Sequence, residues 1–316
     1  MNRNCLFCYQ PLAPGQIDFH PGCSRKIFGK PAPPELPYSE DDMLKLAEKV
    51  IQSRVAVAGV QPKLSLHLEK AHRGQSPARF TIVGLWGQYI LKPPANQYPF
   101  LPELEDLTMH LAQSCRMATV PHSLVRLKSG TLAYLTKRID RERGIEIHIE
   151  DMCQLSGRLT EHKYHGSHEQ IAKIILRHSV HPGLDLINFF EQVLFSFING
   201  NADMHLKNFS LIDQPEIGWI LAPAYDLVPT ALVVKGDPEE LALTLNGKKR
   251  NFTRKDFENV FTAFGLEQKT ISGLFKKFEH GQAEWQKWIE AAFIPTGLKS
   301  AYNALIQSRM KQIGIT

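Results

Sequence analysis

Long apolar segments are absent from this sequence. No run approaches the ~18 apolar residues that a membrane-spanning helix needs. The richest stretch, from Leu184 to Ile198, is interrupted by the polar residues Asp185, Asn188, Glu191 and Gln192. The first sixteen residues are polar and contain proline, so they lack the apolar core of a signal peptide. These absences exclude a transmembrane helix, and we expect a cytoplasmic protein.

Cysteine is scarce and odd in number. The 316 residues include five cysteines, which favours reduced thiols or metal ligands over a disulfide framework. Three of them lie near the N-terminus, where Cys5-x-x-Cys8 is followed by His20-x-x-Cys23. Two close pairs of soft ligands are typical of a structural zinc knuckle. Small buried thiols that bind nothing are the alternative, so zinc at these four residues stays an open interpretation.

A strong charge excess, an internal repeat and a low-complexity tract are also lacking. The net charge of +5 would suit an acidic partner, a nucleotide or a nucleic acid, but it selects none of them. The hydrophobic fraction of 43% and the charged fraction of 22% are ordinary for a globular protein, which argues against disorder. A chain of 316 residues is long enough for about two domains.

Proline separates the N-terminal cysteines from the rest of the chain. The segment Lys30-Pro31-Ala32-Pro33-Pro34-Glu35-Leu36-Pro37 is too rich in proline for a helix or a central strand. We therefore expect three parts. Residues 1–38 form a cysteine-bearing segment with a stiff linker, residues 39–140 an N-terminal lobe, and residues 141–316 a helical C-terminal lobe.

The periodicity of apolar residues predicts a small β-rich lobe followed by a larger helical one. Ser39, with Asp42 three residues later, resembles a helix N-cap, and we expect the helix to end near Ser53. Strands are predicted at 64–68, 88–92, 131–136, 209–212 and 219–221, and a helix at 103–112. From about residue 150 the chain is otherwise mainly helical. The fold class that this order indicates is α+β, a two-lobed protein-kinase-like fold.

The segment from Asn199 to Asn208, Asn-Gly-Asn-Ala-Asp-Met-His-Leu-Lys-Asn, carries the strongest chemical signal. Protein kinases place a catalytic Asp five residues before a metal-binding Asn, between a helix and a short strand. Asp203 and Asn208 have this separation and this context. Asp203 would orient the attacking hydroxyl and accept its proton, and Asn208 would hold Mg²⁺. Lys207 adds a cation for the transferred phosphate.

Two further positions complete the expected nucleotide site. Asp226 follows a predicted hairpin, where kinases carry the Asp of their DFG motif, and would be the second magnesium ligand. Lys92 ends an apolar strand, and its ammonium group would meet the α- and β-phosphates while Glu105 pairs with it. We place His205 in the nucleotide-binding set, as a residue that holds the loop rather than as a catalytic group. The alternative is that Asp and Asn here only cap turns.

A phosphate-covering loop is predicted before the first strand. The candidates are Val57, Ala58, Gly59, Val60, Gln61 and Lys63. One glycine alone would not identify such a loop. Small residues, a position just before a strand and the cation of Lys63 support the interpretation.

Five motifs in this order resemble those of the HipA family of toxin kinases. They are Val57–Lys63, Ile90–Pro93, Glu150–Gln154, Asn201–Ser210 and Ala222–Leu227, and the resemblance runs from about Val57 to Phe257. It implies a serine/threonine kinase of a bacterial toxin–antitoxin system that uses ATP and Mg²⁺ and phosphorylates an aminoacyl-tRNA synthetase. By position, Asp203 would be the base, Asn208 and Asp226 the magnesium ligands, and Lys92 and Lys63 the phosphate contacts.

Two departures from the family pattern shape the expected partners. Some 56 residues precede the phosphate loop, whereas full-length HipA has an extra N-terminal subdomain there. The chain is therefore similar to HipT, for which a separate small protein, HipS, supplies that subdomain. We expect a HipS-like protein to dock on an apolar surface of the β lobe, at Leu64, Leu66 and Leu68 or on the opposite face, and a HipB-like DNA-binding antitoxin to join it.

The second departure is that Ala56 and Ala58 replace the family's regulatory serines, which excludes autophosphorylation there. We expect no membrane contact, and no nucleic-acid contact except through the antitoxin.

Two other functions fit parts of the sequence. A kinase of a small molecule or lipid headgroup is possible because Asp-x-His-x-x-Asn also resembles the catalytic loop of phosphoinositide kinases. A zinc-ribbon nucleic-acid-binding protein without catalysis would use the N-terminal ligands and Lys248-Lys249-Arg250. That alternative leaves the ordered set of Asp203, Asn208 and Asp226 unexplained. The run His162, His165 and His168 is interpreted as a solvated loop near the substrate cleft.

Overall fold

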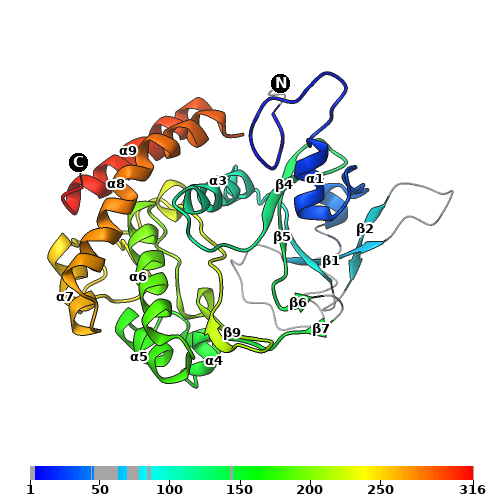
Figure 1. Cartoon of the computed structure of the whole chain (residues 1–316). Coiled ribbons are helices and arrows are strands. Elements are labelled where there is room, and N and C mark those ends of the chain that lie inside the picture. Colours follow the sequence, from blue (N-terminus) through cyan, green and yellow to red (C-terminus); the bar gives the residue numbers. More distant parts are fainter. Residues whose placement is uncertain are drawn as a thin grey trace. The chain divides into compact units, whose positions relative to one another are not determined.

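The computed structural model describes residues 4–43, 45, 63–69, 78–83, 87–142 and 145–315. The chain divides into two compact units (Figure 1). Unit 1 comprises Met1–Asp106, Val120–Ile139 and Ala291–Ile294, and unit 2 comprises Leu107–Thr119, Asp140–Glu290 and Pro295–Thr316. The N-terminal cysteines thus belong to the same unit as the first strands. One division falls after Ile139, at the end of the last strand region of unit 1.

Unit 1 is built on a five-stranded antiparallel sheet with the order β2-β1-β3-β5-β4. Its strands are β1 (Leu64–Glu69), β2 (Arg79–Val83), β3 (Tyr89–Lys92), β4 (His122–Arg126) and β5 (Leu132–Lys137). The strands predicted at 64–68, 88–92 and 131–136 are confirmed as β1, β3 and β5. Strands β2 and β4 were not predicted.

Helix α1 (Pro21–Phe28) packs on one face of this sheet. The strand register places Leu66 opposite Tyr89 and Leu68 opposite Phe80, so these side chains share a face. Phe28 of α1 meets Phe80 edge-on with ring centroids 5.9 Å apart, and the Tyr89 hydroxyl donates to the carbonyl of Ile27 at 2.9 Å. The N-terminal segment therefore covers the sheet within the unit.

This cover corrects the docking surface expected at the β1 leucines. Leu64 and Leu66 are 2% and 0% exposed, and Leu68 is half-buried. An apolar side chain that is already buried inside its own unit offers no area for a partner to remove from water. The prediction of a docking site on these leucines is wrong for Leu64 and Leu66.

Two predictions for the N-terminal part can be compared with the structure. Ser39 and Asp42 form the expected cap, since the Asp42 carboxylate accepts from the Ser39 amide at 2.9 Å and from its hydroxyl at 2.7 Å. The rest of the predicted helix, from residue 46 to Ser53, lies outside the described residues. The proline-rich segment is extended and is fastened to the sheet at Glu35, whose amide donates to Ala78 and whose carbonyl accepts from Phe80.

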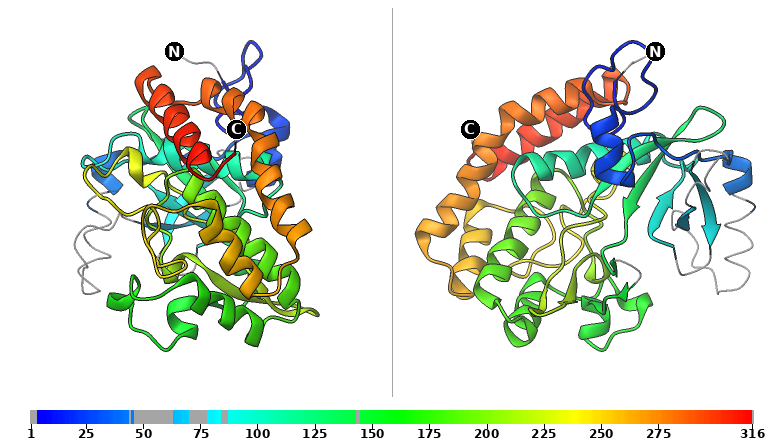
Figure 2. Two further views of the ribbon diagram at one scale, coloured as in Figure 1. Left: turned by 90° about the vertical axis from the view of Figure 1, so that its left-hand side faces the viewer. Right: turned by 45° about the vertical axis from the view of Figure 1, so that its right-hand side comes forward.

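Unit 2 is mainly helical, as predicted. Its helices are α4 (Met152–Leu155), α5 (His168–His178), α6 (Pro182–Ile198), α7 (Arg254–Ala263), α8 (Gln268–Ala291) and α9 (Thr296–Gln312). Helix α3 (Leu101–Ser114) contributes to both units. Figure 1 and Figure 2 show α8 and α9 side by side. A three-stranded sheet, β10-β9-β8, consists of β8 (Ile149–Asp151), β9 (Ser210–Gln214) and β10 (Gly218–Leu221), and β6 (Arg141–Glu142) pairs with β7 (Ile145–Glu146).

Helix α6 is largely buried within unit 2, and two of its polar side chains, those of Asp185 and Glu191, have defined partners. The Asp185 carboxylate accepts from the Leu221 amide at 2.7 Å and from the Ser179 hydroxyl at 2.5 Å. Glu191 forms an ion pair with Lys277 of α8. Two of the polar interruptions, Asp185 and Glu191, thus connect α6 to β10 and α8. Among the described residues, no helix is both long and apolar enough to cross a membrane.

The histidine run divides into a surface pair and a buried ring. His162 and His165 stack with centroids 5.2 Å apart, in or beside the 3₁₀ turn Thr160–His162. His168, at the start of α5, is fully buried near the rings of Phe189 and Phe209. The expectation of a solvated loop is therefore wrong for His168. Burial lowers the pKa of His168 to about 3, because the apolar surroundings disfavour the charged ring.

Replacing His168 by Phe should make stability less sensitive to acid. The unfolded chain binds a proton at His168 once the pH falls below about 6.5, whereas the folded chain stays neutral there. The wild type should therefore lose about 2 kcal/mol of unfolding free energy at this site between pH 7 and 5, and His168→Phe should not. Urea unfolding at both pH values measures the difference. The surface variant His162→Phe should show the same change of unfolding free energy with pH as the wild type. An equal change for His168→Phe and wild type would contradict this role of His168.

Candidate functional site

The loop that carries Asp203 begins where α6 ends. Asn199, the C-cap residue, is buried and accepts at Oδ1 from the Tyr302 hydroxyl of α9 at 3.0 Å. Gly200 follows with a backbone φ of 67°, which residues with a Cβ rarely adopt. A Cβ at this position would also lie 2.6 Å from Cδ2 of Leu305. The positive φ therefore favours glycine here, and a Cβ would also require the Leu305 side chain to move.

Hydrogen bonds inside the loop fix the positions of Asp203 and Asn208. The Asp203 amide donates to Oδ1 of Asn201 at 3.1 Å, and the Ala202 amide donates to the Thr230 hydroxyl at 2.8 Å. Nδ2 of Asn208 donates to the Asp203 carbonyl at 2.9 Å. This hydrogen bond fixes the orientation of the Asn208 side-chain amide. Its Oδ1, the acceptor atom, is the one that can bind a cation.

The Asp203 carboxylate accepts a hydrogen bond from a tyrosine. The Tyr164 hydroxyl donates to Oδ1 of Asp203 at 2.6 Å, across 39 residues of sequence. Burial and the neighbouring carboxylate raise the pKa of Tyr164 above its usual range. Its segment is attached to the loop through the Lys163 carbonyl, which accepts from the Leu206 amide at 3.1 Å. Tyr164 was not predicted as a site residue, because no spacing rule links it to the loop.

His205 supports the loop as a neutral ring. It is 6% exposed, and burial lowers its pKa to about 4. Its ring meets that of Tyr164 edge-on, with centroids 5.0 Å apart. A neutral imidazole gives no positive charge to a triphosphate. The ring therefore suits a role in holding the loop, as the sequence interpretation had it.

Lys207 forms an ion pair with Asp151, a residue of the motif Glu150–Gln154. Its Nζ lies 2.6 Å from Oδ2 of Asp151. The other oxygen of Asp151 caps α4 by accepting from the Gln154 amide at 2.9 Å, within a capping box. The Lys207 side chain is 34% exposed. Asp151 thus fixes the direction of an ammonium group that remains accessible.

Asp226 follows β10 in a strained backbone conformation. Its φ is 57°, unusual for a residue with a side chain. The preceding Tyr225 joins this segment to the Asp203 loop, since its hydroxyl lies 2.5 Å from Oγ of Ser210 and 3.1 Å from the Lys207 carbonyl. Nδ2 of Asn201 also donates to the Asp226 carbonyl at 3.5 Å. The two acidic segments are therefore tied together by backbone and side-chain contacts inside unit 2.

The unit 1 candidates include a buried ion pair. Nζ of Lys92 lies 2.5 Å from Oε1 of Glu105, and the side chains are 4% and 0% exposed. The predicted pairing of Lys92 with Glu105 is confirmed. Lys63 is exposed, directly before β1. The other loop candidates, Val57, Ala58, Gly59, Val60 and Gln61, lie outside the described residues, as does Ala56.

The donor set of unit 2 fits a small divalent cation. Carboxylate and amide oxygens from Asp226 and Asn208 are the ligand types that Mg²⁺ takes together with phosphate oxygens. Asp203 supplies a carboxylate that accepts from a hydroxyl group. The order of helix, acidic loop, hairpin and second acidic residue is that of phosphoryl-transfer sites.

Fold and site together define a protein of the kinase-like class. The sequence belongs to a particular family within it, since residues 55–285 match the HipA-like C-terminal domain. The resemblance to HipA that the motifs carry is thereby confirmed.

Curated relatives agree with this assignment. A kinase candidate of Haemophilus influenzae is 31% identical over 210 residues, which is 62% of this chain and 58% of that protein. The kinase candidate Y4dM of Sinorhizobium fredii is 29% identical over 289 residues, covering 86% of this chain and 67% of its own length. The serine/threonine-protein kinase toxin HipA of Shewanella oneidensis is 30% identical over 195 residues, covering 55% and 43%. The chain thus spans between 43% and 67% of these relatives.

Solved structures confirm the fold. HipA of Shewanella oneidensis MR-1, from a complex with HipB and operator DNA, aligns with a TM-score of 0.68 and 23% identity, covering 84% of this chain and 70% of that one. The proinflammatory kinase CtkA of Helicobacter pylori aligns with a TM-score of 0.53 and 17% identity, covering 71% and 87%. The predicted α+β, kinase-like fold class is therefore confirmed.

Proposed function

We propose that this chain is an ATP- and Mg²⁺-dependent serine/threonine protein kinase, the toxin of a bacterial toxin–antitoxin system. The observation that carries the proposal is the loop from Asp203 to Asn208, which Tyr225 ties to the segment of Asp226. Membership of the HipA family and relatives named as kinases support it.

In this proposal Asp203 orients the substrate hydroxyl and accepts its proton. The hydrogen bond from Tyr164 supports the role, because it shows that an O–H donor can approach Oδ1 of Asp203 to 2.6 Å. A serine or threonine hydroxyl of the substrate would take the place of the phenol. The Lys207 ammonium, held by Asp151, then stabilises negative charge on the transferred phosphoryl group.

Asn208 and Asp226 are the proposed magnesium ligands. When bound, Mg²⁺ neutralises the phosphate charge that would otherwise face Asp226. Lys92, whose direction Glu105 fixes, and Lys63 are the proposed phosphate contacts, with residues 57–61 as the covering loop. Removing either member of the buried pair of Lys92 and Glu105 would leave one charge without compensation.

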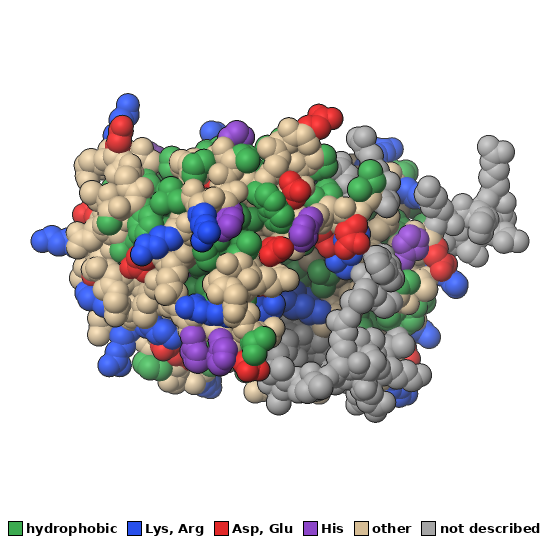
Figure 3. All heavy atoms as spheres, turned by 90° about the horizontal axis from the view of Figure 1, so that it is seen from below, with side chains coloured by type: hydrophobic (Ala, Val, Ile, Leu, Met, Phe, Trp, Pro, Cys, Tyr) green, Lys and Arg blue, Asp and Glu red, His purple; other side chains and the backbone are tan. Residues whose placement is uncertain are grey.

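The proposed substrate is an aminoacyl-tRNA synthetase, on the resemblance to HipA. A HipB-like antitoxin is the proposed partner, supported by the HipA structure solved with HipB and operator DNA. A HipS-like companion is proposed on resemblance alone, and Leu64 and Leu66 are no part of its docking site because they are buried. Figure 3 shows basic and acidic side chains interspersed on the described part of one face. DNA contact through the antitoxin only is proposed on the resemblance to HipA.

Asp203→Asn should abolish phosphoryl transfer while leaving the fold intact. Loss of a general base typically lowers the rate on the order of a hundredfold or more. Transfer of label from γ-labelled ATP to proteins of a cell extract measures the effect. Asp213→Asn, which changes an exposed carboxylate on the following strand, is the matched control and should keep wild-type transfer.

A comparison of the wild type with Asp203→Asn also identifies the substrate. Phosphopeptide mass spectrometry of cells that express the wild type, against cells that express Asp203→Asn, should show serine or threonine phosphorylation of a synthetase in the wild type alone. Near wild-type turnover by Asp203→Asn would contradict the role of Asp203. Label that enters lipid or a small molecule, and no protein, would instead favour the alternative kinase class.

Tyr164→Phe should strengthen binding of the protein substrate. The substrate hydroxyl would no longer have to displace the phenol from Asp203, and a net hydrogen bond of ~1 kcal/mol corresponds to a KM lowered about fivefold. The phenylalanine ring keeps its edge-on contact with His205, so kcat should be retained. Steady-state kinetics with the identified substrate test this. A large loss of kcat with unchanged KM would show that the phenol positions Asp203 instead of competing with the substrate.

A further inference from the structure

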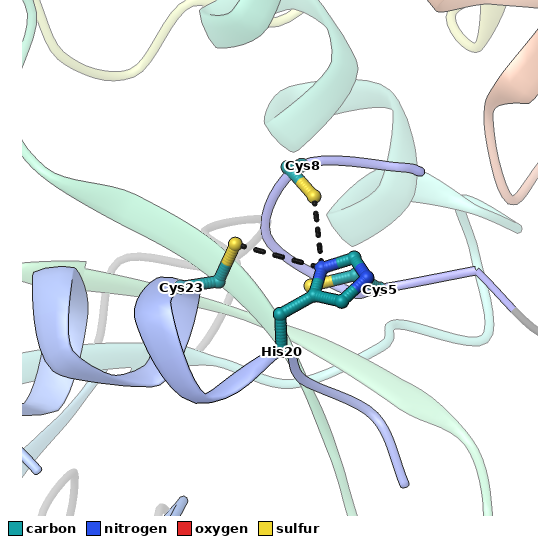
Figure 4. Close-up of side chains that lie close together, drawn as sticks. All are labelled: Cys5, Cys8, His20 and Cys23. Carbon is teal, nitrogen blue, oxygen red and sulfur yellow. Dashed lines mark hydrogen bonds between the residues drawn. The ribbon is translucent and has the colours of Figure 1, made fainter. Parts of the chain in front are cut away.

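Four potential metal ligands converge near the N-terminus of unit 1 (Figure 4). The sulfurs of Cys5, Cys8 and Cys23 and a ring nitrogen of His20 all lie within 4.8 Å of one another. Nδ1 of His20 is 3.4 Å from Sγ of Cys8 and 3.8 Å from Sγ of Cys23. In a tetrahedral site with Zn–S of about 2.3 Å and Zn–N of about 2.0 Å, neighbouring S and N ligands are about 3.5 Å apart. The observed distances lie on either side of that value.

The hydrogen bond of the other ring nitrogen prepares His20 to bind a metal. Nε2 of His20 lies 3.0 Å from the carbonyl oxygen of Pro11. A carbonyl can only accept, so Nε2 carries the hydrogen and the neutral ring presents the lone pair of Nδ1 to the sulfurs. Metal-binding histidines are usually held by such a contact. The three thiols form no disulfide, so they are available as ligands.

Two short backbone segments bring the ligands together. Cys5 and Cys8 lie on a turn closed by hydrogen bonds from the Tyr9 amide to the Cys5 carbonyl, 2.9 Å, and from the Cys5 amide to the Gln10 carbonyl, 2.8 Å. His20 is the N-cap residue of α1, and Cys23 lies in the first turn of that helix. This arrangement of one ligand pair on a turn and one at a helix start is common in small zinc sites.

We propose that Cys5, Cys8, His20 and Cys23 bind a structural zinc ion, and that the metal holds Tyr9 in place as a clamp on helix α3. Each ligand contributes one atom, Sγ or Nδ1, and together they complete a tetrahedral set with no position left for a substrate. The thiols bind as thiolates, so their protons pass to solvent when zinc enters.

Tyr9 connects the cluster to α3. It follows Cys8 directly, has φ of 59° and is 1% exposed. Its hydroxyl donates to Oδ2 of Asp106 at 2.8 Å, while Nδ1 of His122 lies 2.7 Å from the other carboxylate oxygen. A residue with a strained backbone conformation persists only where its surroundings fix it. The proposed zinc would supply that constraint next to Tyr9.

The clamp acts beside the nucleotide candidates of unit 1. Asp106 is the neighbour of Glu105, whose carboxylate pairs with Lys92 at 2.5 Å. Loss of zinc would release Tyr9 from Asp106 and loosen the first turns of α3 at Glu105. An effect of zinc loss on ATP binding through Glu105 and Lys92 rests on the proposed kinase function. Metal binding itself does not.

Metal analysis of the full chain tests the zinc site. Protein purified without chelator should contain about one zinc per chain. Replacing zinc by Co²⁺ should give the visible bands of tetrahedral cobalt and a thiolate-to-cobalt charge-transfer band. Cys8→Ser should lose the metal, His20→Cys should retain it with four sulfur ligands, and Cys115→Ser, outside the cluster, should bind as the wild type does. Absence of zinc and of cobalt bands in the wild type, or a Cys5–Cys8 disulfide found by mass spectrometry, would overturn the site.

Hydrogen exchange tests the clamp without requiring turnover. In the wild type stripped of zinc, the amides of residues 5–9 and of the first turns of α3 should exchange on the order of tenfold faster, and those of α6 should not change. Tyr9→Phe should keep zinc but raise the KM for ATP. If α3 exchanges equally with and without zinc, the clamp is refuted while the metal site stands. If neither the wild type nor any variant transfers phosphate, the kinase proposal fails. The results of the metal analysis and of hydrogen exchange still stand in that case.

Discussion

One hydrogen bond closes the loop on which the proposed chemistry depends. Nδ2 of Asn208 donates to the Asp203 carbonyl, so the two residues that would handle the proton and the metal keep a fixed separation. The C-terminus of α6, where Gly200 is the residue that fits, sets where the loop starts. Phosphoryl transfer needs little from a protein beyond positioned charge, and positions of this kind must be held before the substrate arrives.

Buried charged groups elsewhere in the chain are also held by defined partners. Each buried carboxylate discussed above has a partner, such as Lys92 for Glu105 or the Leu221 amide for Asp185. Burying an unpaired carboxylate would be costly, so these contacts also fix the elements that carry them. His168 and His205 follow the opposite rule, because burial keeps both rings neutral. In the N-terminal cluster, the proposed zinc would balance the charge of the thiolates.

Much of the fold and part of the site could be predicted from local sequence. Alternating leucines predicted β1, the spacing of Asp203 and Asn208 predicted the loop, and Lys92 with Glu105 followed from the order of a strand and a helix. These signals act over a few residues or through a known order of elements. Tyr164 reaches Asp203 across 39 residues, and that contact depends on where the segment before α5 is placed in three dimensions. The burial of Leu66 likewise depends on α1, which no pattern assigned to this face.

The central claim is that Asn208 and Asp226 hold a magnesium ion for a nucleotide. A crystal structure of the chain with Mg²⁺ and a non-hydrolysable ATP analogue tests it most directly. We expect a metal ion coordinated by Oδ1 of Asn208, a carboxylate oxygen of Asp226 and oxygens of the triphosphate, with Asp203 facing the terminal phosphate. A nucleotide bound elsewhere, or a metal ion that contacts neither Asn208 nor Asp226, would contradict it.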